Sequence, residues 1–107
     1  MNFIRVDILL PTYDNDKYPV ETEKFIQTLD ELFDRFKGGN LDYTPIMGKW
    51  EDPKTHEVFL DENMTYWVIC EDSLDNIRFL KEEYEPKLRK RFKQRAMMIY
   101  YWNDKML

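Results

Sequence analysis

Cysteine, histidine, glycine and proline are all scarce, with one, one, three and five residues among 107. The single cysteine, Cys70, has no internal disulfide partner, and its place in an apolar run is typical of a core residue rather than a reactive thiol. The sequence contains no glycine-rich phosphate loop, no cysteine pair and no second histidine. It therefore predicts no cofactor and no metal site. So few glycines and prolines also predict short loops.

Long apolar runs are missing too. No stretch approaches the roughly 18 consecutive apolar residues of a transmembrane helix. The first residues lack the basic region followed by an apolar region that marks a signal peptide. We therefore expect a cytoplasmic protein without a membrane partner.

The length and composition of the chain predict one folded domain spanning residues 1–107. Apolar residues make up 43% of the chain, aromatic residues 16% and charged residues 35%. The net charge is −5, yet residues 87–95 carry six positive charges and no negative one. The acidic total argues against a nucleic-acid-binding protein, whereas the basic segment keeps a local anion site open.

Four segments predict β-strands from their alternating or continuous apolar character. Met64 to Glu71 is apolar on both faces and contains no glycine or proline, so it predicts a central strand. Pro45 has no backbone N–H group to donate to a sheet ladder, so the segment 43–50 is predicted to be an edge strand. A short strand-like piece, 57–60, precedes the central strand. The four strands are expected at 3–10, 43–50, 64–71 and 96–102.

Two segments predict amphipathic helices, at 21–37 and 74–92. The apolar stripe of the first helix consists of Phe25, Ile26, Leu29, Leu32, Phe33 and Phe36. Gly38 and Gly39 end that helix, because glycine readily adopts the left-handed conformation of a helix C-cap. Pro86 removes one backbone hydrogen bond from the second helix and predicts a kink near residues 82–85.

The β-α-β-β-α-β order predicts an α+β fold, a ferredoxin-like sandwich in which two helices cover one face of a four-stranded antiparallel sheet. The other face is then bare and aromatic. Alternation alone leaves open whether Tyr66 or Trp67, and Tyr100 or Tyr101, points to that face. The residues proposed for this interface or pocket are Arg5, Asp7, Trp50, Tyr66, Tyr100 and Trp102. A patch of this kind rarely stays in water, so we expect a second copy to cover it as a homodimer.

Two short motifs resemble a family of small uncharacterised bacterial proteins. They are Gly-x-Trp-x-Asp-Pro, here 48–53 and followed by Asp61-Glu62, and Arg-Phe-x-Gln, here 91–94 and preceded by Tyr84. The similarity spans about residues 45–102. It implies an α+β fold, and it supplies no established activity and no catalytic residue.

The remaining candidate residues have ordinary structural interpretations. His56 follows a turn and is expected to be a solvated loop residue. Asp14 and Asp16 fit a turn better than a cation site, because Asp-x-Asp lacks the glycine and glutamate of a calcium loop. Basic charges near a helix end complement the helix dipole. A phosphate or nucleic-acid site is the alternative for this segment, and its candidate residues are Lys87, Arg91 and Arg95.

The sequence leaves three classes of function open, and the phosphate- or nucleic-acid-binding module through residues 87–95 is the third. The first is a non-enzymatic homodimer whose bare sheet face mediates self-association. The second is an enzyme built as a dimeric α+β barrel around a small apolar molecule, with polar groups supplied by Tyr66, Tyr100, Arg5 or Asp7. An enclosed, polar-lined cavity would favour the enzyme, and a filled interface would favour the homodimer.

Overall fold

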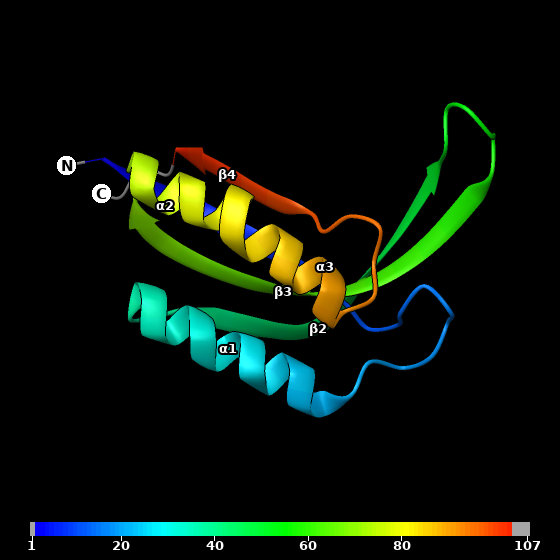
Figure 1. The fold of residues 1–107 in the computed structure, drawn as a ribbon, viewed down its shortest axis with the longest axis horizontal. Coiled ribbons are helices and arrows are strands. Elements are labelled where there is room, and N and C mark those ends of the chain that lie inside the picture. The colour runs from blue at the N-terminus through cyan, green and yellow to red at the C-terminus, as the bar shows by residue number, and fades with distance from the viewer. Residues whose placement is uncertain (1, 104–107) are drawn as a thin grey trace.

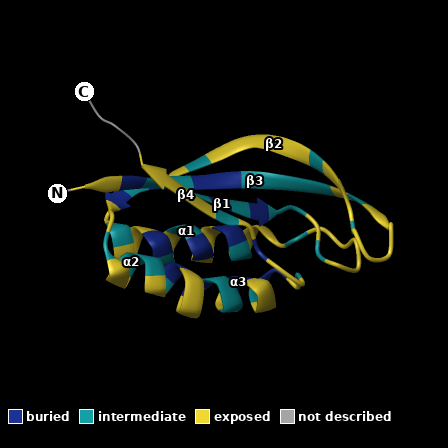
Figure 2. Ribbon diagram, turned by 90° about the horizontal axis from the view of Figure 1, so that it is seen from above, coloured by how far each residue is buried: buried dark blue, intermediate teal, exposed yellow. Residues whose placement is uncertain are grey.

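A computed structural model describes residues 2–103 of the chain. Its four strands form one antiparallel sheet in the order β2-β3-β1-β4, and the helices cover one face of that sheet (Figures 1 and 2). This confirms the predicted βαββαβ sandwich. The elements are β1 (Phe3–Pro11), α1 (Thr22–Phe36), β2 (Asn40–Glu51), β3 (Val58–Glu71), α2 (Leu74–Arg78), a π-helical turn η1 (Phe79–Tyr84), α3 (Glu85–Arg91) and β4 (Ile99–Asn103).

The core lies between the sheet and the helices. Alternate residues of β1 face the helices and are almost fully buried, because side chains of a strand point to opposite faces in turn. The residues of β3 that pair with these residues of β1 extend the apolar layer. Between the helices, the rings of Phe25 and Phe92 pack edge to face with 5.4 Å between ring centres. The most deeply buried core residues are Ile4, Val6, Ile8, Leu10, Leu32, Tyr66, Leu88 and Phe92.

The second helical segment consists of α2, η1 and α3, and the π-helical turn η1 overlaps the region near residues 82–85 where Pro86 predicted an interruption. Pro86 lies in the first turn of α3, and its missing N–H group removes one hydrogen bond, because η1 continues into α3 without a break. The preceding turn, η1, is a π-helix, which accommodates the interruption without ending the helix. The segment therefore stays continuous and covers the sheet along its length (Figure 1).

Several expectations need correction. The strand-like piece at 57–60 is the start of β3, which runs without a break from Val58 to Glu71. The first helix has a narrower buried stripe than predicted, because Ile26 and Phe33 are more than half exposed. The last strand begins at Ile99 rather than Ala96. None of these changes alters the order of the strands.

The β2–β3 hairpin extends beyond the helices as a two-stranded arm, residues 46–62 (Figure 1). A β-bulge between Asp42 and Ile46 separates the arm from the rest of β2. Because β2 is an edge strand, Pro45 at the bulge breaks no ladder to a further strand, as predicted.

Candidate ligand site on the open sheet face

The strand register decides which side chains reach the face without helices. On β1, Arg5 lies opposite Ile69 of β3 and Trp102 of β4, and Asp7 lies opposite Trp67 and Tyr100. These residues alternate with the buried residues of β1, so they point away from the core. Arg5, Asp7, Tyr100 and Trp102 are thus brought together on the open face, in the centre and along one side of the sheet.

Arg5 is held between two indole rings. Its guanidinium carbon lies 4.3 Å from the ring centre of Trp67 and 5.7 Å from that of Trp102. Its Nε–H group donates a hydrogen bond of 2.9 Å to Oδ1 of Asp7. The ring faces attract the cation and the carboxylate orients it, so the guanidinium has little freedom to move.

The surroundings of this ion pair are aromatic and partly open. Tyr100 and Trp102 are 42% and 45% exposed, whereas the Asp7 side chain is only 15% exposed. Thr65 also belongs to this face, two residues before Trp67 on β3. Its hydroxyl oxygen is buried and has no hydrogen-bond partner among residues 2–103. An aromatic surface with a few fixed polar groups is the usual composition of a small-molecule site.

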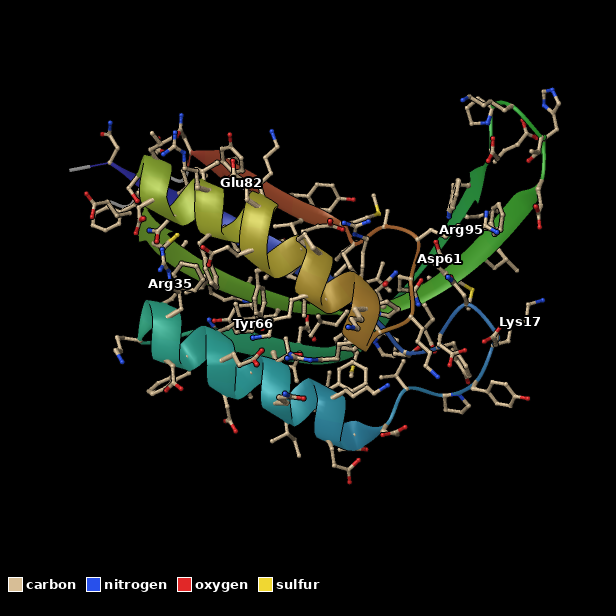
Figure 3. The ribbon with its side chains drawn as sticks, in the orientation of Figure 1. Lys17, Arg35, Asp61, Tyr66, Glu82 and Arg95 are labelled. Atoms are coloured by element: carbon tan, nitrogen blue, oxygen red, sulfur yellow. The ribbon has the colours of Figure 1, made fainter. Side chains whose placement is uncertain are left out.

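Tyr66 does not belong to the open face, so its assignment to the interface or pocket is wrong. It is fully buried on the helix side of the sheet, where its hydroxyl donates a 2.7 Å hydrogen bond to the carbonyl oxygen of Gly38 (Figure 3). Burial, with a smaller contribution from Cys70, raises the pKa of Tyr66 to about 12. Trp67 takes the expected place of Tyr66 on the open face, because the register with β1 fixes which of the two neighbours faces out.

Trp50 lies in the arm, away from the Arg5 cluster. Its ring stacks on Phe59 with 4.6 Å between ring centres, and its indole N–H donates a 2.6 Å hydrogen bond to Oδ2 of Asp61. Asp52 caps the turn of the same hairpin through a hydrogen bond from the backbone N–H of Lys54. The Gly-x-Trp-x-Asp-Pro motif and its downstream acidic residue thus stabilise the hairpin.

The candidate anion-binding residues do not form a common site. Lys87 and Arg91 both approach Glu31 on α1, whereas Arg95 lies exposed in the loop after α3 (Figure 3). The two guanidinium nitrogens of Arg91 donate to the two carboxylate oxygens of Glu31 at 2.7 and 2.8 Å. Two of the three cations are therefore already engaged by a carboxylate of this chain.

The Glu31 cluster fastens the two helical segments to each other. The Tyr84 hydroxyl donates to the same carboxylate at 2.9 Å, and Arg91 also donates to the hydroxyl of the buried Thr28. Burial alone would raise the pKa of Glu31, but the hydrogen bonds from Arg91 and Tyr84 and the nearby positive charges outweigh burial and lower it to about 2. Burial and the bond to Glu31 raise the pKa of Tyr84. A shallow groove of about 400 Å³ beside the cluster lies between α1 and η1.

Other sequence candidates have structural roles. His56 is exposed in the hairpin turn, 3.4 Å from a carboxylate oxygen of Glu51. Cys70 is buried in β3, and burial raises the pKa of its thiol, which disfavours a nucleophilic thiolate. Within residues 2–103, no three histidine, cysteine or acidic side chains come close enough to hold a metal ion. No helix in the same range is long and apolar enough to span a membrane.

The fold is an α+β sandwich with helices on one face of the sheet and, within residues 2–103, no helix on the other face (Figure 2). No family model and no curated protein sequence matches this chain, so membership of the uncharacterised bacterial family stays a prediction. Among solved structures, the chain is similar to a phage SAM lyase in complex with S-methyl-5′-thioadenosine. The TM-score is 0.69, and the similarity covers 95% of this chain and 81% of the lyase chain at 12% sequence identity. This similarity shows a shared fold.

Proposed function

We propose that the protein binds a flat small molecule of the nucleoside class on the open sheet face. The observation that carries the proposal is the Arg5–Asp7 ion pair set between the indole rings of Trp67 and Trp102, on a face that no helix covers. A cation and a carboxylate fixed in aromatic surroundings can orient a ligand, and the rings provide stacking area. Stacking of a base on an aromatic side chain contributes about 1–3 kcal/mol in proteins that bind single-stranded nucleic acids.

The similar phage structure supports the choice of ligand. It has the same overall architecture and was solved in complex with S-methyl-5′-thioadenosine, which contains a flat purine ring and a ribose. The exposed rings of Trp102 and Tyr100 suit such a purine. The site was anticipated in the sequence as a place for a small apolar ligand. Its Arg5–Asp7 pair makes a ligand with polar groups the better fit.

We propose in addition that a second copy covers the open face, as the sequence predicted. The central part of this face carries one positive and one negative side chain, Arg5 and Asp7, which already neutralise each other. Two chains of net charge −5 therefore meet here without strong repulsion. A symmetric pair would enclose the aromatic site between two sheets and exclude water from it.

The binding proposal is tested by titrating the purified protein with S-methyl-5′-thioadenosine, followed by tryptophan fluorescence and calorimetry. We expect saturable binding that Trp102→Leu weakens about tenfold or more, because the stacking surface is lost. Trp50→Phe is the matched control, since Trp50 stacks on Phe59 in the arm and not on the ligand site. Absence of binding, or equal weakening by both substitutions, would contradict the proposal.

A second candidate is an enzyme that acts on a nucleoside-class substrate at this site, and the fold shared with a lyase favours it. The buried Tyr66 cannot serve as a polar group in such a site, which leaves Arg5, Asp7 and Tyr100 from the predicted set. Incubation with S-adenosylmethionine, followed by chromatography for S-methyl-5′-thioadenosine, tests this candidate. Release of product that Asp7→Asn abolishes would favour the enzyme over a binding module.

A further inference from the structure

The guanidinium of Arg5 uses only part of its hydrogen-bonding capacity. Its Nε–H group is bound to Asp7, whereas its two terminal amino groups make no hydrogen bond within residues 2–103. The side chain is 32% exposed, so part of it is accessible from solvent. Arginine presents its N–H groups as a planar fork that matches the two oxygens of a carboxylate or a phosphate.

The fork is also held in place before any ligand arrives. The ring of Trp67 lies against the guanidinium at 4.3 Å, and the bond to Asp7 sets its rotation about that ring. A donor pair fixed in this way loses little conformational entropy when it binds an anion. A lysine in the same position would offer a single mobile ammonium group instead.

Aromatic and aliphatic side chains form most of the surroundings of Arg5 on the open face. The nearest uncharged neighbours of Arg5 on this face are Ile69, Trp67, Tyr100 and Trp102, whereas Glu71, opposite Phe3, is a second acidic residue on the same face. The carboxylate of Asp7 is already engaged by the Nε–H group of Arg5. The low polarity of the surroundings strengthens an ionic hydrogen bond to the remaining N–H groups.

We infer that the ligand is an anionic nucleoside derivative, whose carboxylate or phosphate group is bound by the terminal amino groups of Arg5 while its ring stacks on the neighbouring aromatic side chains. This inference rests on the proposed function and specifies the substrate class of the same site. It assigns Arg5 to charge recognition and Trp102 to ring recognition. The two kinds of contact are therefore separable by substitution.

The test compares three probes that share one ring: adenosine, adenosine-5′-carboxylic acid and adenosine 5′-monophosphate. Each is titrated against the wild-type protein by calorimetry at low and at physiological salt. We expect at least one anionic probe to bind about tenfold more tightly than adenosine, with a smaller advantage at higher salt. The preferred anion identifies the group as carboxylate or phosphate.

Two substitutions separate the contacts. Arg5→Gln should abolish the advantage of the anionic probe and change the affinity for adenosine by less than about threefold, because the stacking surface remains. Trp102→Leu should weaken all three probes by a similar factor. Arg5→Lys keeps the charge but loses the planar fork, so it should recover only part of the advantage. Circular dichroism and melting curves establish that each variant is folded.

The possible outcomes distinguish this inference from the proposed function. Equal binding of adenosine and both anionic probes to the wild-type protein would overturn the inference and leave the nucleoside site standing. An anionic advantage that survives Arg5→Gln would also overturn it. Failure of all three probes and of S-methyl-5′-thioadenosine to bind would overturn both. If Arg5→Gln does not fold, the Arg5→Lys variant and the salt dependence of the wild-type protein decide between these outcomes.

Discussion

Glu31 offers the sharpest test of what holds the two helical segments together. Its carboxylate receives two hydrogen bonds from Arg91, one from Tyr84 and an ion pair from Lys87 at 3.3 Å. The Arg91 side chain is only 8% exposed. Replacing Glu31 by glutamine keeps the size and one acceptor but removes the negative charge from this arrangement.

The expected magnitude follows from the pKa of Glu31. A fall from 4.5 to about 2 corresponds to about 3 kcal/mol of extra stabilisation of the charged carboxylate in the folded state. The Glu31 side chain is 27% exposed and Lys87 is 55% exposed, so solvent screening reduces this value. We expect Glu31→Gln to lower the free energy of unfolding by about 1–2 kcal/mol at pH 7.

The same reasoning fixes the pH dependence. The pKa of Glu31 is lower in the folded than in the unfolded state, so the stabilisation is complete above about pH 4.5 and is lost as the pH falls toward 2. The wild-type protein and the Glu31→Gln variant should therefore differ at pH 7, differ much less at pH 2.5, and converge in stability as the pH falls below about 2. Urea unfolding followed by tryptophan fluorescence at several pH values measures the difference.

Arg89→Gln provides the control for Glu31→Gln. Arg89, whose side chain is 43% exposed, pairs with Glu85 one helical turn away at 2.8 Å, and such i,i+4 pairs contribute only about 0.3–0.5 kcal/mol. Two results would refute a stabilising role for the Glu31 cluster. One is a Glu31→Gln loss in the free energy of unfolding no larger than that of Arg89→Gln. The other is a loss that persists unchanged at pH 2.5.

Three further predictions concern stability near the sheet. Tyr66→Phe should lower the free energy of unfolding by about 1 kcal/mol and the melting temperature by about 4–8 °C, because the Gly38 carbonyl loses its 2.7 Å hydrogen bond; an unchanged melting curve would exclude a contribution from this bond. Gly39→Ala should be more damaging, since Gly39 has a φ of 143° and an added Cβ would overlap the Tyr66 ring, and a soluble variant with native stability would contradict the packing described. Thr65→Val should raise the free energy of unfolding by about 1 kcal/mol, because it removes a buried hydroxyl without a partner in residues 2–103, and a decrease measured by urea unfolding would show that the hydroxyl is satisfied in solution.

The alternation and helical periodicity of the chain determined the order of the elements and the class of fold. β1 shows the reason, because its buried residues Ile4, Val6, Ile8 and Leu10 follow the period of two without exception. Pro86 likewise predicted an interruption in the second helical segment, and the π-helical turn η1 precedes it. These features depend on residues close together in the chain, and local sequence specifies them.

Local sequence did not determine which side chains form the site on the open face. Local sequence cannot tell Tyr66 from Trp67, because both faces of that strand are apolar, and a one-residue change in register exchanges them. Pairing of Ile8 with Tyr66 and of Asp7 with Trp67 decided the question. The role of Lys87 and Arg91 was hidden for a similar reason, since Glu31 is more than fifty residues away in sequence and no local pattern links it to them.

The sequence by itself thus determined a four-stranded sheet with helices on one side, because the spacing of apolar side chains along each segment specifies which elements form and how they can share a core. Only the tertiary structure decided that Arg5 is set between Trp67 and Trp102 and that the basic helix end is fastened to Glu31. The physical reason is that strand register and helix packing bring together side chains from distant parts of the chain, and the chemistry of a site depends on those distances.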